Sequence, residues 1–254
     1  MRTLPWLWLG FFIPMSVLFI GSDSSYHLET TLCSPSLQHP LGCDSFGRDM
    51  LTTLLRASGL SLLFAGFAAS LGILGGMILG SLIVLLPPWG RSVCERGLEF
   101  FLSFPYLLIA LGLVAVTGPG WSTLVVALLL GSLPMFTRLM LVRAKEVTHE
   151  NYFLISRSNG AGHLHLMSFH LFPNLMGLAS VKAPNLFAQA IMAEATLSFL
   201  GVGAPIGKDT LGALLLMGKN YLLEAPHIAL TSGVPLAFTV FSLQILSSRL
   251  VRER

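Results

Sequence analysis

Long apolar segments separated by shorter polar ones run through most of the chain. A helix that crosses a membrane needs about 20 largely apolar residues, and six segments have approximately that length or more. They cover residues 4–20, 60–86, 98–116, 122–141, 175–200 and 228–246. The pattern predicts an all-α polytopic membrane protein with about six transmembrane helices. The polar segments between them cover 21–58, 89–97, 142–173 and the glycine-rich 201–227.

The composition agrees with this pattern and excludes several other classes. Hydrophobic residues make up 54% of the 254 residues and charged residues only 11%, against about 25% charged residues in soluble domains. So few charges cannot cover the surface of a soluble globule of this size. The same figures exclude a disordered chain and a nucleic-acid-binding arm, so we expect a lipid bilayer and no nucleic acid as partner.

The first apolar segment has two interpretations. Arg2 precedes it, as in a cleaved signal peptide. However, Trp6 and Trp8 are typical of an interfacial aromatic belt, and no small-residue cleavage site follows, only Gly-Ser-Asp-Ser-Ser at 21–25. We therefore favour an uncleaved membrane anchor.

The distribution of Lys and Arg predicts the orientation, because basic residues concentrate beside cytoplasmic membrane ends. With the N-terminus inside, Lys182 lies within the fifth segment and four basic residues lie outside: Arg48, Arg56, Lys208 and Lys219. Ten lie inside: Arg2, Arg91, Arg96, Arg138, Arg143, Lys145, Arg157, Arg249, Arg252 and Arg254. We expect a multi-pass membrane protein with both termini in the cytoplasm.

This topology predicts on which side of the membrane each of the three cysteines lies. Cys33 and Cys43 share the outer segment and either pair there or stay free, whereas Cys94 lies inside. They are too few for a disulfide scaffold.

Small residues recur at every fourth position of the second apolar segment: Ala68, Gly72, Gly76 and Gly80. Such a stripe lets a neighbouring helix approach closely, so it predicts tight helix packing and no chemistry.

The cytoplasmic segment 142–173 predicts a helix–turn–helix. Tyr152 and Ile155 share one helical face, and residues 159–162 (Asn-Gly-Ala-Gly) interrupt the pattern. A second apolar face then follows, formed by Leu164, Met167 and Leu171, before Pro173. From periodicity alone, an amphipathic loop resting on lipid headgroups explains the segment equally well.

Four motifs in order make the chain resemble a known family. The inner segment is similar to the "EAA" loop of ABC-importer permeases at Tyr152, Arg157, Gly160, Ala161, His170, Pro173 and Asn174. The other motifs are His-Pro-Leu-Gly-Cys-Asp at 39–44 with Gly47, Arg48 and Asp49; Phe-Pro-Tyr-Leu-Leu at 104–108 with Gly-Pro-Gly at 118–120; and the run Ala-Glu-Ala-Thr-Leu-Ser-Phe-Leu-Gly-Val-Gly at 193–203. Together they resemble the C-type permease of dipeptide, oligopeptide and nickel ABC importers.

The chain departs from that family at two places. Leu154-Ile155-Ser156 replaces the Glu-Ala-Ala triplet, so a charge often found there is absent. Near the C-terminus, Phe241-Ser242 and Ile245-Leu246 stand where the family tends to have Phe-Asn and Gly-Asp.

The resemblance implies a division of labour between several chains. It implies a single transmembrane permease domain, 1–254, in which 1–59 form the first crossing and outer loop and 60–254 the permease core. The inner hairpin would dock on an ATPase, where Gly160 and Gly162 would allow close approach and Arg157 would pair with an acidic residue. The face formed by Leu164, Met167 and Leu171 would pack on the transmembrane bundle. The sequence contains no G-x-x-x-x-G-K-[ST] motif, so we expect no enzymatic activity and no bound cofactor.

The partners implied by the resemblance use the nucleotide and deliver the solute. They are two cytoplasmic ATPase subunits that use ATP and Mg, a second homologous permease subunit, and an extracytoplasmic substrate-binding protein. The substrate stays open among dipeptides, oligopeptides, nickel and metal chelates.

Two ionisable residues lie in the fifth apolar segment. Glu194, followed by Ser198, is a candidate for the translocation pathway because an ionisable group at membrane depth marks function by default; the alternative is an ion pair with Lys or Arg at the outer mouth. Lys182 is expected to reach the lipid headgroups.

The outer motif predicts a surface element formed by Asp44, Gly47, Arg48 and Asp49. We expect Asp44 or Ser45 to cap a short helix at 48–56 that rests on the membrane through Met50, Leu51, Leu54 and Leu55. It either supports the structure or docks a receptor.

The remaining patterns argue against other functions. The histidines His149, His163, His165 and His170 lie on the inner segment, and His27, His39 and His227 are scattered outside, so we expect no metal site. A membrane metalloprotease would need H-E-x-x-H, which is absent. A channel or secondary carrier would normally show internal repeats and several charges at mid-membrane, and a structural anchor would not need the turn glycines.

Overall fold

The structure is a computed structural model that describes residues 4–21, 31–203, 205 and 208–252. Arg2, His27 and Arg254, which enter the charge and histidine arguments, lie outside the described residues. The described part is helical, with one isolated antiparallel bridge between Cys43 and Asp49. Its helices are α1 (Leu4–Leu18), α2 (Met50–Leu85), α3 (Pro88–Ser103), α4 (Tyr106–Thr117), α5 (Trp121–Thr148), α6 (Asn151–Ser158), α7 (His163–His165), the π-helix η2 (Leu166–Leu171), α8 (Phe172–Phe199), α9 (Leu211–Asn220) and α10 (Pro226–Arg252).

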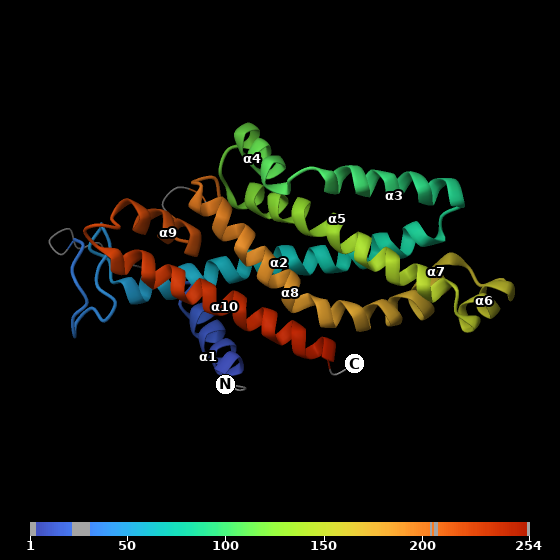
Figure 1. Ribbon diagram of the computed structural model, residues 1–254, viewed down its shortest axis with the longest axis horizontal. Helices are drawn as coiled ribbons and strands as arrows, with labels where there is room; N and C mark the ends of the chain where they lie inside the picture. The colour runs from blue at the N-terminus through green and yellow to red at the C-terminus, as the bar shows by residue number, and fades with distance from the viewer. Residues whose placement is uncertain (1–3, 22–30, 204, 206–207, 253–254) are drawn as a thin grey trace.

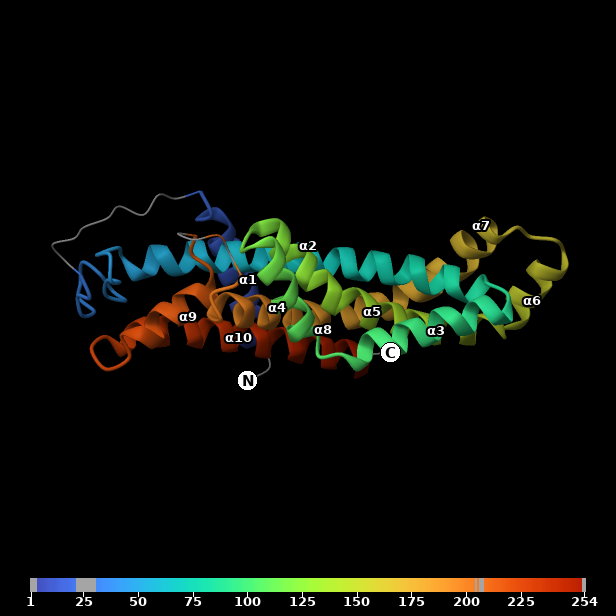
Figure 2. The ribbon, with the colours of Figure 1, turned by 90° about the horizontal axis from the view of Figure 1, so that it is seen from above.

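The helices form an elongated bundle whose two ends differ. α2 runs along most of the long axis, with α5, α8 and α10 beside it (Figures 1 and 2). The outer segment before α2 lies at one end together with α9, and the α6–α7 hairpin projects at the other (Figure 1). α1 packs against α2 and α10. The outer motif and the inner hairpin are therefore separated by the whole length of the bundle.

The second expected span and the expected short helix at 48–56 are one continuous helix. α2 is 36 residues long, about 54 Å at 1.5 Å per residue. Asp49 caps it by accepting a hydrogen bond from the Thr52 amide, so the prediction that Asp44 or Ser45 caps it is wrong. Met50, Leu54 and Leu55 are buried inside the protein, so they do not rest on a membrane surface as predicted.

The third expected span, 98–116, is broken rather than continuous. α3 and α4 meet at an angle of 80° on either side of Phe104-Pro105, because a proline stops the preceding residue from continuing the helix. The expected polar link at 89–97 belongs to α3, which is held on α5 by Lys145 Nζ and Glu95 Oε1 at 2.7 Å. The glycine-rich segment 201–227 likewise contains a helix, α9.

Length and composition support fewer crossings than the six expected. Three helices of the described chain, α2, α5 and α10, are long and apolar enough to span a membrane, and the bent pair α3–α4 makes up to four. α1 is apolar but short. α8 has 28 residues but carries Lys182, Asn185, Gln189 and Glu194. All six expected segments contain helix, and the number six itself stays a prediction.

The stripe of small residues on α2 packs against α5, as predicted. Ala68, Gly72, Gly76 and Gly80 are all buried. A Cβ on Gly76 would lie 2.9 Å from the Thr137 backbone nitrogen, and one on Gly80 would lie 2.9 Å from that of Leu141. Lipid offers no hydrophobic drive for helix association, so close packing holds such helices together. α2 and α5 are therefore joined along this line.

We predict that Gly76→Ala destabilises the protein by about 1–3 kcal/mol, because the new methyl group overpacks the backbone of α5. The measurement is thermal unfolding of the purified protein in detergent. The matched control is Gly112→Ala in α4, where a Cβ meets nothing within 4 Å. Equal unfolding temperatures for the two variants would contradict the prediction.

Candidate functional site

The hairpin formed by α6 and α7 turns at Gly160, which follows the end of α6. The Gly160 amide donates to the Arg157 carbonyl at 3.1 Å and the Ala161 amide to the Ser156 carbonyl at 3.2 Å, which is the Schellman pattern. Gly160 has φ +83°, and no atom lies within 4 Å of a Cβ built there. Glycine is needed here for its left-handed backbone, and the space beside it is open in the isolated chain.

Three side chains attach the hairpin to the bundle: Phe153, Leu166 and Leu171. Each is at most 3% exposed, and all belong to the core cluster that includes Leu175. The predicted face of Leu164, Met167 and Leu171 is only partly right, because Leu164 is 73% exposed. The physical reason is the π-helix η2, whose i→i+5 hydrogen bonds shift the positions that face inward. Leu166, which lies in the π-helix, was missed for the same reason, and Phe153 on the regular helix α6 was missed as well.

His170 links the two halves of the hairpin. Its Nε2 lies 3.0 Å from Ser156 Oγ on α6. The side-chain amide of Asn174 donates a hydrogen bond to the backbone carbonyl of His170 at 2.7 Å. The rings of Tyr152 and His170 are 5.8 Å apart. The structure therefore brings together three of the residues that carry the family resemblance, Tyr152, His170 and Asn174.

The outward surface of the hairpin carries several large apolar side chains among polar ones, together with Arg157. Tyr152, Leu154, Ile155, Leu164 and Phe169 are exposed. Arg157 is exposed and has no ion-pair or hydrogen-bond partner for its side chain within the described chain. Gly162 and Pro173 are exposed as well. An exposed apolar surface beside a cation is typical of a site that contacts another protein.

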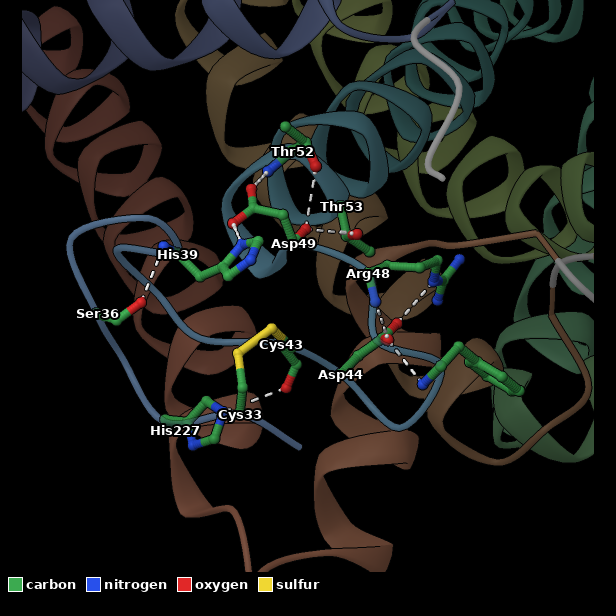
Figure 3. The surroundings of a disulfide bond; sticks show 11 residues. Cys33, Ser36, His39, Cys43, Asp44, Arg48, Asp49, Thr52, Thr53 and His227 are labelled. Atoms are coloured by element: carbon green, nitrogen blue, oxygen red, sulfur yellow. Dashed lines mark hydrogen bonds and ion pairs between the residues drawn. A yellow bond between two sulfur atoms is a disulfide. The ribbon is translucent and has the colours of Figure 1, made fainter. Parts of the chain in front are cut away.

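The outer segment forms a compact loop closed by a disulfide between Cys33 and Cys43 (Figure 3). His39 Nδ1 lies 3.2 Å from Asp49 Oδ1, which ties the loop to the start of α2. Gly42 has φ +78°, and a Cβ there would lie 2.6 Å from the Cys33 carbonyl oxygen. The sequence left the pairing of Cys33 and Cys43 open, and the structure joins them.

A buried charge cluster lies beneath this loop. Arg48 Nε contacts Asp44 Oδ2 at 2.6 Å, and its two terminal nitrogens donate to Asp209 at 2.6 and 3.1 Å. Asp44 also accepts from the amides of Phe46 and Arg48 (Figure 3). Asp44 is 0% and Arg48 4% exposed, and Gly47 is buried too. The predicted surface motif is thus largely internal, and only Asp49 is partly exposed.

The cluster keeps Arg48 charged. Burial lowers the pKa of the Arg48 guanidinium, but the hydrogen bonds and charges of Asp209 and Asp44 more than offset this and raise it overall. Asp209 lies 161 residues away in sequence, and sequence reasoning missed it because no local pattern marks a partner so distant. Through Asp209, the outer loop is fixed to the segment that leads into α9.

Glu194 and Ser198 lie next to this outer cluster, inside the protein. Glu194 is 0% exposed and its Oε1 accepts from Ser198 Oγ at 2.7 Å. The hydroxyls of Ser61 on α2 and Thr210 before α9 also face the carboxyl, while no standard hydrogen bond of the described chain reaches Oε2. Hydroxyl groups, rather than the Lys or Arg of the alternative interpretation, surround Glu194. Its role in the pathway stays a prediction.

Comparison with known proteins identifies the class. The family described as "Binding-protein-dependent transport system inner membrane component" matches residues 72–252. A putative peptide transport system permease protein of Brucella suis is 31% identical over 91% of this chain and 77% of its own length. The di/tripeptide transport system permease protein DppC of Pseudomonas aeruginosa is 31% identical over 83% of this chain and 69% of its own length. The glutathione transport system permease protein GsiD of Salmonella typhimurium is 32% identical over 90% of this chain and 76% of its own length.

A solved structure shares the fold. A chain of the MetNI methionine ABC transporter in inward-facing conformations matches with TM-score 0.63 and 21% identity, covering 80% of this chain and 97% of that one. The chain therefore belongs to the family of binding-protein-dependent inner membrane transport components. It is a multi-pass permease component of an ABC importer, as the sequence resemblance implied.

We predict that Arg48→Met destabilises the protein by roughly 3–5 kcal/mol, because it leaves two buried carboxylates without a cation. Thermal unfolding in detergent measures the loss. The double variant Arg48→Met with Asp209→Asn should lose much less stability than the sum of the losses of the two single variants, because the two side chains interact directly.

The control for this prediction is Arg138→Met. Arg138 forms an exposed pair with Glu99 at 3.9 Å, and exposed pairs contribute about 0–1 kcal/mol. A loss for Arg48→Met no larger than that for Arg138→Met would show that the buried cluster is not an essential support.

Proposed function

We propose that the chain forms half of the translocation pathway of a binding-protein-dependent importer and couples ATP hydrolysis by separate subunits to the uptake of di- or oligopeptides. A second, homologous permease subunit completes the pathway. Two cytoplasmic ATPase subunits use ATP and Mg, and an extracytoplasmic binding protein delivers the solute. The chain itself has no P-loop motif, so the nucleotide is bound elsewhere.

The inner hairpin is the observation that supports coupling. Its outward side exposes apolar side chains, while Phe153, Leu166 and Leu171 fix its inner side to the core. A rigid hairpin with exposed apolar side chains transmits movement of a docked partner into α5 and α8, which it joins directly (Figure 2). We infer that Tyr152, Arg157, Gly160, Ala161, Gly162, His170, Pro173 and Asn174 form or support the contact with the ATPase.

Peptides are the favoured solutes because relatives at about 31% identity carry that description. Nickel or a metal chelate carried by the same machine is the alternative. The described residues contain no group of three or more His, Cys, Asp or Glu side chains that could hold a metal ion, which gives this alternative no support within them. A channel or secondary carrier is the second alternative, and the exposed hairpin favours a coupled importer over it.

The proposed orientation places both termini and the hairpin in the cytoplasm. Reporter fusions after residue 160 and after residue 252 should be active with a cytoplasmic reporter and inactive with a periplasmic one. A fusion after residue 38, in the outer segment, should behave in the opposite way. Periplasmic activity of the fusion at 160 would refute the proposed coupling role.

We predict that Gly160→Val reduces ATP-dependent uptake at least ~10-fold while ATPase subunits remain able to hydrolyse ATP. A β-branched residue is a severe misfit at φ +83°, so the turn and the contact surface beside it are distorted. Uptake and ATP hydrolysis are measured together in proteoliposomes that contain the whole transporter.

The matched variant at this position is Gly160→Asn, because asparagine tolerates the left-handed region far better than valine. It should keep most of the uptake. If Gly160→Val transports like the unmodified protein, the hairpin does not couple the two activities.

A further inference from the structure

Three neighbouring cavities follow the line between α5 and α8. Their volumes are about 120, 190 and 430 Å³. The first two share Met135 and Gln189 as lining residues, and the last two share Leu139 and Lys182. α5 and α8 pack against each other and run side by side across the middle of the bundle (Figures 1 and 2). The cavities therefore form one interrupted groove along the bundle.

Polar side chains of α8 line this groove. Lys182, Asn185 and Gln189 all border the cavity of 190 Å³, because positions i, i+3 and i+7 share one face of a helix. Asn174 and Arg143 continue the polar lining into the cavity of 430 Å³. The sequence indicated Lys182 as a residue that reaches the headgroups, whereas the structure places it on the wall of this groove.

The ammonium of Lys182 has no counterion in the described chain. Glu146 is the acidic residue that lines the same cavity, and its Oε2 is bound by Arg143 Nη1 at 2.5 Å. The carboxamides of Asn185 and Gln189 likewise make no side-chain hydrogen bond within the described residues. Charged residues inside membrane segments are costly and characteristically face a water-filled cavity on a substrate path. Three unpaired polar groups in a row thus mark a position for a polar ligand.

We propose that Lys182, with Asn185 and Gln189, binds the carboxylate end of the transported solute on this chain's side of the pathway. The ammonium supplies the positive charge that a carboxylate requires, and each carboxamide both donates and accepts hydrogen bonds, as a peptide group does. The ligand class is a small carboxylate-bearing, peptide-like molecule. This inference rests on the proposed function and extends it to one site.

The first test asks whether the site is aqueous and positive, without using a transported solute. The assembled transporter carries Cys94→Ala, which removes the free thiol, together with Asn185→Cys. Anionic sulfonatoethyl and cationic trimethylammonioethyl methanethiosulfonate are the probes. With Lys182 present, we expect the ratio of anionic to cationic reaction rates to exceed that of the Lys182→Met variant by ~10-fold.

The control thiol is Ser180→Cys, at an exposed position two residues from Lys182 and hence about 200° away around α8. It should react far more slowly than Asn185→Cys. Labelling of Asn185→Cys no faster than this control would mean a dry permease interface or a lipid-facing position, and a ratio independent of Lys182 would mean no positive site. Either result overturns the proposal.

The second test measures transport in proteoliposomes that contain the whole transporter and its binding protein. Lys182→Met should lower uptake of dialanine ~10-fold and should lower uptake of alanyl-alaninamide, which lacks the carboxylate, much less. Lys182→Arg should retain dialanine uptake. Uptake of dialanine by Lys182→Met at the unmodified rate overturns the proposal. If the unmodified transporter imports neither compound, uptake of these dipeptides is refuted, while the labelling ratio still decides whether the carboxylate position exists.

Discussion

The close contact between α2 and α5 is the constraint on which the rest of the structure depends. In a bilayer the surroundings are as apolar as the side chains, so helices gain little from simply hiding apolar surface. Gly72, Gly76 and Gly80 let the backbones of the two helices meet. α5 leads directly into the hairpin at one end, and α2 begins in the outer loop at the other. This helix pair therefore connects the two ends of the molecule through a stiff interface.

The two ends of the bundle are held together by different kinds of interaction. At the outer end, a disulfide and the Asp44–Arg48–Asp209 cluster join segments from distant parts of the chain. At the inner end, the hairpin is fixed by apolar contacts and by the link between His170 and Ser156, while its other side stays exposed. Between the two ends, α8 carries polar residues on the face toward α5, and its other faces pack against α2, α9 and α10. A fixed outer end, a polar groove and an exposed hairpin are the features from which we infer a coupled importer subunit.

The individual predictions succeeded where local chemistry decides the outcome. The stripe on α2 and the turn at Gly160 each depend on a residue's own backbone or its nearest neighbours. The break near Pro105 was not predicted, because 98–116 was expected to be one continuous span. Predictions that needed register or distant partners were less accurate. Leu164 faces outward because a π-helix changes the phase. The short helix at 48–56 is part of α2 because 57–60 contain no proline and Gly59 is buried within the continuous helix.

The sequence alone determined the membrane class, the positions of the apolar segments and the family, because hydrophobicity and motif order are properties of the chain itself. Only the tertiary structure decided that Asp209 neutralises Arg48, that hydroxyl groups enclose Glu194, and that Lys182 lines a groove shared with α5. Each of these depends on side chains brought together from distant segments. Burial and charge pairing are properties of the packed bundle, so no pattern within one segment could reveal them.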